Sequence, residues 1–262
     1  MTSRFVALIV PLALFALIDR ALADDGIGTA TDITTTVTGA LASTSESTLK
    51  TGDDVFQDET IVTDTNGVGQ FEFRDKTKLA IGPGSTLVLD NFVYDSNSSK
   101  GKVVINLTQG ALRFITGKAD HDAYEIVTPT ATIGVRGTVF DVYAKPDGEL
   151  AVAMIEGAVE VCPQGSACRL HNVIGKFLTM TPTGVFTLRD KWDGTFLSGI
   201  SFASALPFLN NQKMLIPALR GKTTTVGLYA AALTKPLERA LKVPLTKPLT
   251  KLPKLKLPKL FK

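Results

Sequence analysis

The stretch that decides the fold is YEIVTPTATIGVRGTVFDVY, residues 124–143. Within it, residues 131–136 (ATIGVR) alternate apolar with polar or small residues. After Gly137 the apolar positions shift by one, to Phe140 and Val142. Period-two alternation predicts a half-buried strand, and a slip at a glycine predicts a β-bulge or corner. We therefore expect two strands to meet at a Gly-Val-Arg-Gly corner, with Gly134 and Gly137 structural and Arg136 held between them.

Short strand patterns recur on both sides of this stretch, from about residue 49 to 188. Turn signals such as Gly82-Pro83-Gly84 and Pro146-Asp147-Gly148 separate them, and no long helical period interrupts the series. This spacing predicts an all-β domain over residues 49–190, either a β-sandwich or a β-helical roll. The expected strands are 69–73, 79–81, 87–94, 102–107, 111–116, 124–128, 130–135, 138–143, 150–155, 158–162, 177–180 and 185–188, with 150–155 and 158–162 forming a hairpin.

An internal similarity supports the roll. Residues 103–115 (VVINLTQGALRFI) and 150–162 (LAVAMIEGAVEVC) align so that Gly110 matches Gly157. Strand-Gly-strand units that repeat stack in β-helix-like folds. We expect both glycines to be structural, while chance similarity between two hairpins is the alternative.

The segments before the β domain differ from it in composition. Residues 1–23 contain Arg4, an apolar run over 5–18 and Ala21-Leu22-Ala23, which is the pattern of a cleaved signal peptide. An uncleaved membrane anchor is the alternative. Residues 24–48 are rich in Thr, Ser and Asp, and we expect a flexible segment with one edge strand near 33–37.

The segments after the β domain form two further regions. Residues 191–234 predict a short helical extension packed on the β body. Residues 235–262 hold eight Lys, one Arg and one Glu among prolines and leucines, whereas residues 24–234 have an acidic excess. Prolines at this spacing predict a disordered or extended tail. We expect its lysines to meet an anionic envelope polymer or lipid surface rather than nucleic acid. The tail lysines chosen as contacts are Lys251, Lys254, Lys256 and Lys259. A merely solubilising tail, or one that folds back on the acidic body, is the alternative.

The two cysteines, Cys162 and Cys168, flank a Pro-Gln-Gly-Ser-Ala loop. In an exported chain this spacing predicts one disulfide that closes a hairpin loop. A metal site is not expected, because the chain has only two histidines and no Cys-x-x-Cys pair. A periplasmic or extracellular location follows from the signal pattern and the cysteines together.

The sequence holds none of the common catalytic motifs, so we expect no enzyme activity and no cofactor. His121, between two aspartates, is a conceivable general base, but a solvated loop histidine explains the pattern as well, and His171 is interpreted in the same way. Arg136 is either a recognition cation or the ion-pair partner of an acid. The acids considered as its partner are Glu125, Asp141 and Glu156.

Several motifs in order resemble one known family. Residues 71–75 (FEFRD), 110–114 (GALRF), 128–140 (TPTATIGVRGTVF) and 156–161 (EGAVEV) resemble the FecR domain, and the match covers about residues 49–165. The resemblance implies an extracytoplasmic β domain, often the sensing half of a regulator that controls a sigma factor.

We expect no cytosolic domain before the apolar segment, and on that expectation the chain is more similar to a stand-alone exported FecR domain. We expect a non-catalytic module that binds a protein or cell-envelope component, with a role in envelope sensing or signalling. A membrane-anchored FecR-type regulator of transmembrane signalling and a weak hydrolase that uses His121 are the alternatives.

Overall fold

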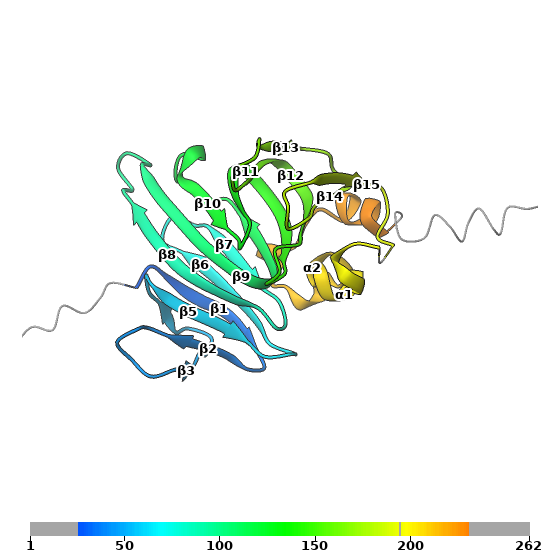
Figure 1. The fold of residues 1–262 in the computed structure, drawn as a ribbon. Helices are drawn as coiled ribbons and strands as arrows, with labels where there is room; N and C mark the ends of the chain where they lie inside the picture. Colours follow the sequence, from blue (N-terminus) through cyan, green and yellow to red (C-terminus); the bar gives the residue numbers. More distant parts are fainter. Residues whose placement is uncertain (1–25, 194, 231–262) are drawn as a thin grey trace, which may run out of the picture.

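The computed structural model describes residues 26–193 and 195–230 (Figure 1). Fifteen strands form one mixed sheet that folds over on itself. The strands are β1 Gly28–Thr34, β2 Val37–Ala40, β3 Ser47–Thr48, β4 Asp54–Val55, β5 Glu59–Thr63, β6 Val68–Phe73, β7 Lys78–Ile81, β8 Thr86–Tyr94, β9 Gly101–Ile115, β10 Tyr124–Val127, β11 Ala131–Ala144, β12 Leu150–Pro163, β13 Arg169–His171, β14 Phe177–Met180 and β15 Phe186–Arg189. The all-β prediction is confirmed.

The helices are short and fall mainly after the last strand. They are the α-helices α1 Phe202–Ala205 and α2 Pro207–Asn210, and the 3-10 helices η1 His121–Ala123, η2 Leu197–Gly199, η3 Gln212–Met214 and η4 Pro217–Leu219. Residues 223–230 are also α-helical. This matches the expected helical extension. Among the described residues, no helix has the length and apolar character needed to cross a membrane.

The folded sheet has two layers, which we name for what covers their outer faces. The open layer runs β3-β2-β5-β8-β9-β10-β11-β12-β13, and its only parallel pair among the described strands is β9 with β10. The capped layer runs β4-β1-β6-β7-β9-β11-β12-β14-β15. The two layers pack face to face as in a β-sandwich. They are also continuous as in a roll, because β9, β11 and β12 belong to both layers.

Each of the three shared strands bends at a glycine with positive φ. The φ values are 99° at Gly110 in β9, 62° at Gly137 in β11 and 82° at Gly157 in β12. The ladder between β11 and β12 shifts register between Arg136 and Val139, which is the bulge expected at Gly137. The expected hairpin over 150–162 is wrong, because β12 is one strand that bends at Gly157. The match between Gly110 and Gly157 reflects two equivalent bends.

The main core lies between the layers. In β11, Ile133 and Val135 point inward before the bend, and Phe140 and Val142 point inward after it, as the phase slip predicts. Phe114 of β9 contacts Phe140 with ring centroids 5.8 Å apart. A bulge shifts the alternation by one residue, so both halves of β11 present apolar side chains to the same core.

The N-terminal segment differs from expectation. Residues 28–40 form two strands, β1 in the capped layer and β2 in the open layer, rather than a flexible segment with one edge strand. Ile27, Ala30 and Val37 are buried in the main core. Thr and Ser are compatible with strands when small apolar residues alternate with them. The polar composition of this segment therefore does not exclude strand structure.

A C-terminal cap, residues 196–230, covers the outer face of the capped layer (Figure 1). Its aromatic cluster centres on Phe177 of β14, whose ring lies 5.1 Å from that of Tyr229 and 6.0 Å from that of Phe202. The Tyr229 hydroxyl donates to the Met154 carbonyl at 2.6 Å. The cap therefore leaves only the open layer with a bare outer face among the described residues.

Candidate functional site

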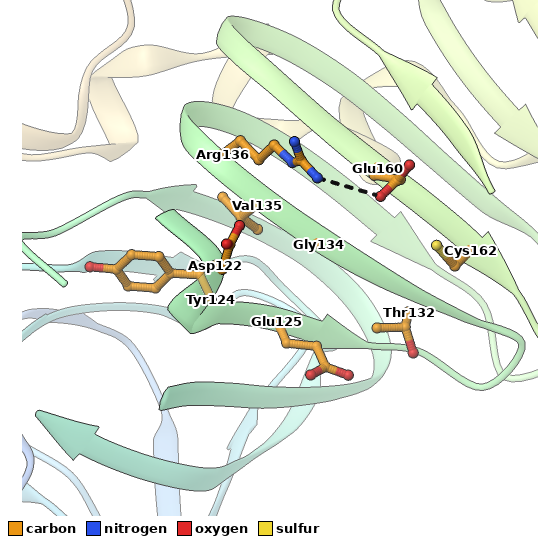
Figure 2. Close-up of a pocket in the computed structure, with 9 residues that line it drawn as sticks. All are labelled: Asp122, Tyr124, Glu125, Thr132, Gly134, Val135, Arg136, Glu160 and Cys162. Carbon is orange, nitrogen blue, oxygen red and sulfur yellow. Dashed lines mark ion pairs between the residues drawn. The ribbon is translucent and has the colours of Figure 1, made fainter. Parts of the chain in front are cut away.

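The outer face of the open layer carries a hollow of about 290 Å³ where β10, β11 and β12 run side by side (Figure 2). It is lined by Asp122, Tyr124, Glu125, Thr132, Gly134, Val135, Arg136, Glu160 and Cys162. Most of its polar groups come from three strands held in fixed register. A rigid sheet presents such side chains at constant spacing, which is what a recognition surface requires.

The floor of the hollow is one cross-strand row. Glu125 pairs with Gly134, and Gly134 pairs with Glu160. A Cβ at residue 134 would meet only the Glu160 carbonyl oxygen, at 3.9 Å. Gly134 is also absent from the positive-φ glycines. The backbone therefore does not require glycine here, and the expected structural role is wrong for Gly134; the missing side chain instead leaves the hollow open.

Arg136 stands at the rim with one weak partner. Its Nη2 atom lies 4.0 Å from Glu160 Oε2, and the two side chains are 63% and 43% exposed. Exposed pairs of this kind contribute about 0–1 kcal/mol. Among the described residues, none of the three acids expected to pair with Arg136 lies within ion-pair distance of it: Asp141 binds Arg113, and Glu156 binds Lys222. The guanidinium is thus available to a partner.

The hollow is acidic overall. Three carboxylates, on Asp122, Glu125 and Glu160, face one guanidinium, on Arg136. Glu125 forms no ion pair with the side chains that the structure describes, and the Arg136–Glu160 contact is long, at 4.0 Å. Such a surface favours a partner that presents basic groups together with an acceptor for the arginine. Within residues 26–193 and 195–230, no group of three His, Cys, Asp or Glu side chains could hold a metal ion.

The two histidines lie in different surroundings. His121 begins η1, and because its side chain is not described, the hydrolase hypothesis stays untested. His171 is not a solvated loop residue as expected: it lies on β13, opposite Val159, and is 1% exposed. Burial lowers the pKa of His171 to about 4, since the charged imidazolium loses its hydration there. Its Nε2 atom has no hydrogen-bond partner within residues 26–193 and 195–230.

His171 should make the protein less stable in mild acid. Its pKa is about 4 when folded and near 6.5 when unfolded, so the unfolded chain binds the proton first. Stability should fall as the pH drops from about 6.5 to 4, by up to about 3 kcal/mol. Urea unfolding at several pH values should show a smaller slope over this window for His171→Gln. An unchanged slope in the variant would mean that the pKa of His171 does not differ between the folded and unfolded states.

Cys162 lines the hollow, and its disulfide with Cys168 is present as expected, with the two Cα atoms 4.0 Å apart. It closes the loop between β12 and β13. A loop this short restrains the unfolded chain modestly, so we expect Cys162→Ser/Cys168→Ser to lose about 2 kcal/mol. Thermal melts with and without a reducing agent provide the check: the reductant should lower the melting temperature of the wild type and leave that of the variant unchanged.

Comparison with known proteins supports the family resemblance. Residues 59–160 match the family described as FecR protein, which agrees with the resemblance found in the sequence. This range begins at β5 and ends in β12, and it includes the lining of the hollow except Cys162. No curated protein matches the chain significantly.

Two solved structures are similar to part of the chain. Both are crystal structures, at 2.50 and 1.65 Å resolution, of a protein from Parabacteroides distasonis ATCC 8503 provisionally described as an anti-sigma factor. The sequence identities are 17% and 18%, with a TM-score of 0.40 for each. The similarity covers 50% of this chain and 58% of the other.

Sequence reasoning found part of this site. It singled out Arg136 and Gly134, and the structure brings both together with Cys162. It missed Glu160 as the partner of Arg136, because only the β11–β12 register places them side by side. The chosen tail lysines, and the signal segment, lie outside the described residues.

Proposed function

We propose that this chain is a non-catalytic, exported FecR-domain module that binds a protein partner through the bare outer face of its open layer. One observation carries the proposal. The cap covers the outer face of one layer, whereas the other layer leaves its outer face exposed, with an acidic hollow and an arginine at its rim. A rigid sheet under such a face holds these side chains at fixed spacing, which suits recognition.

Export is supported by the disulfide, which forms and persists in oxidising compartments. A module of this kind would report on the cell envelope by holding or releasing its partner. The membrane-anchored regulator remains the second form of this proposal, since both forms need an envelope-side FecR domain. The basic tail supplies a second surface, for an anionic polymer or lipid headgroups.

Charge reversal at the rim tests the proposal. Immobilised wild type, Arg136→Glu and Gly134→Val are mixed with an envelope-protein extract, crosslinked, and the bound proteins identified. We expect one species to be retained by the wild type and reduced on the order of tenfold by each variant, as for loss of a central contact. Lys191→Glu, an exposed charge reversal between β15 and the cap, is the matched control and should retain the species.

A truncation to residues 1–234 separates the hollow from the tail. Capture that survives truncation but not Arg136→Glu supports the open layer. Capture that survives Arg136→Glu and disappears with the tail would contradict the proposal and assign binding to the basic segment. Raising the salt concentration should weaken tail-mediated capture most, because exposed lysines are strongly screened.

A further inference from the structure

A ten-residue stretch of the cap is held like a bound peptide. We call residues 212–221 the strap. The Gln70 side chain of β6 donates from Nε2 to the Met214 carbonyl at 3.2 Å and accepts from the Ile216 amide at 2.8 Å. Arg113 of β9 donates from Nη1 to the Leu219 carbonyl at 3.3 Å. The sheet therefore recognises the strap backbone through side chains, and no strand of the described residues pairs with it.

These contacts come from one straight row across the capped layer. Asp32, Gln70, Ala80, Arg113 and Asp141 are successive cross-strand partners on β1, β6, β7, β9 and β11. The polar members bind one another: Gln70 donates to Asp32 at 2.7 Å, and Arg113 donates through two nitrogens to the Asp141 carboxylate. Each recognition side chain is thus fixed by a neighbour in the row.

Ala80 breaks the polar row and opens an apolar trough. Leu215 and Leu219 of the strap are 2% and 0% exposed, and they pack in one cluster with Val68, Ala80 and Phe208. The Arg113 guanidinium lies 5.8 Å from the centre of the Phe208 ring. Two leucines four residues apart therefore fill the trough, while the backbone between and beside them meets Gln70 and Arg113.

The trough and its occupant come from different parts of the chain. Gln70, Ala80 and Arg113 lie within the matched FecR range, residues 59–160, and the strap lies outside it. Arg113 and Gln70 are 0% exposed with the strap in place. Burying the Arg113–Asp141 pair is costly, so its presence points to a role beyond stability. Without an occupant, the Gln70 amide and Arg113 Nη1 would lose their backbone partners.

The strap ends are anchored independently of the trough. Phe202 and Tyr229, before and after it, pack in the separate cluster around Phe177. Between these anchors the strap contains only the single-turn helices η3 and η4. Short 3-10 turns have poor hydrogen-bond geometry, so the strap can leave the sheet at lower cost than the anchors that flank it.

We propose that the trough on the capped layer is a peptide-binding site, with the strap as its resident ligand. The partner it fits is a protein segment of the same chemistry: one without an α-helix, with two leucines four residues apart and backbone groups free to bond Gln70 and Arg113. Such a segment binds by displacing the strap. The trough lies on the capped layer and the hollow lies on the open layer. A test of peptide binding at the trough is therefore independent of the test of the proposed function.

Peptide binding to the full chain tests the site. A fluorescent peptide of residues 211–222, NQKMLIPALRGK, is titrated into wild type and into the variant Leu215→Ser/Leu219→Ser, which loosens the strap. We expect saturable anisotropy changes with the variant, and affinity for the wild type weaker on the order of a hundredfold, because its own strap competes at a high effective concentration. A peptide with both leucines replaced by serine should not bind.

Gln70→Ala in the loosened variant should weaken the peptide further. Equal binding of the leucine and serine peptides, or no saturation by a loosened variant that still melts cooperatively, would overturn the proposal.

If the loosened variant does not fold, hydrogen exchange of the wild type tests the proposal instead. The Ile216 and Leu219 amides should exchange through local opening, well before the β9 and β11 amides. If the Ile216 and Leu219 amides exchanged at the same rate as the amides of β9 and β11, the strap would not detach from the sheet by local opening. Dimer formation by the loosened variant would instead assign the trough to strap exchange between copies.

Discussion

Asp141→Ala should be among the most destabilising single substitutions in the protein, with an expected loss of about 3–5 kcal/mol. The Arg113 side chain is 0% exposed, and Asp141 is 2% exposed; its carboxylate binds Arg113 through both oxygens, at 2.8 Å for Nη2 to Oδ2. Removing the carboxylate leaves a buried guanidinium with one carbonyl partner. Burial raises the pKa of Asp141, and the Arg113 guanidinium opposes that shift, so each charge depends on the other.

The double replacement Arg113→Met/Asp141→Leu is the control. It removes both charges and keeps similar volume, so it should recover most of the loss in urea unfolding, as buried pairs replaced by apolar residues often do. It should nevertheless weaken the strap contact at Leu219, which hydrogen exchange can report separately. If Asp141→Ala and the double variant are equally unstable, packing rather than the uncompensated charge sets the cost.

The strand pattern made much of the fold predictable. Alternation before and after Gly137 predicts both faces of β11. The similarity of 103–115 to 150–162 predicts repeated strand-Gly-strand units, and the structure shows a positive-φ glycine within one strand in each. The pattern does not show which strands are hydrogen-bonded neighbours in the sheet. Residues 150–155 and 158–162 were expected to form a hairpin, because a glycine between two strand segments is compatible with a turn as well as with a bend inside one strand.

The site was less predictable, because its chemistry depends on which strands are neighbours. Glu160 is the partner of Arg136 through the register of β11 with β12. Asp141 lies on the outer face of the capped layer with Arg113, because the bulge at Gly137 shifts the alternation of β11 by one residue. His171 was misjudged for a similar reason. Its polar neighbours in sequence suggested a solvated loop, but pairing with Val159 buries it.

Gly110→Val and Gly157→Val are expected to be as damaging as the loss of Asp141. At Gly110, φ is +99° and a Cβ would lie 2.5 Å from Ser85 Cα; at Gly157, φ is +82° and a Cβ would lie 2.4 Å from the Gly137 carbonyl oxygen. A β-branched residue is strained in this backbone region, and the clashing atoms belong to backbone that cannot turn away. We expect a loss on the order of 3 kcal/mol or more for each, since both strain and close contact contribute.

Gly134→Ala provides the matched control, because a Cβ there meets nothing closer than 3.9 Å and the backbone has no positive φ. It should change the free energy of unfolding by less than about 1 kcal/mol, since surface changes without clash or strain are mild. Urea unfolding of the three variants decides the matter. Comparable losses at 110, 134 and 157 would contradict the bends at Gly110 and Gly157, because the positive φ and the close backbone contacts there are what distinguish those two glycines from Gly134.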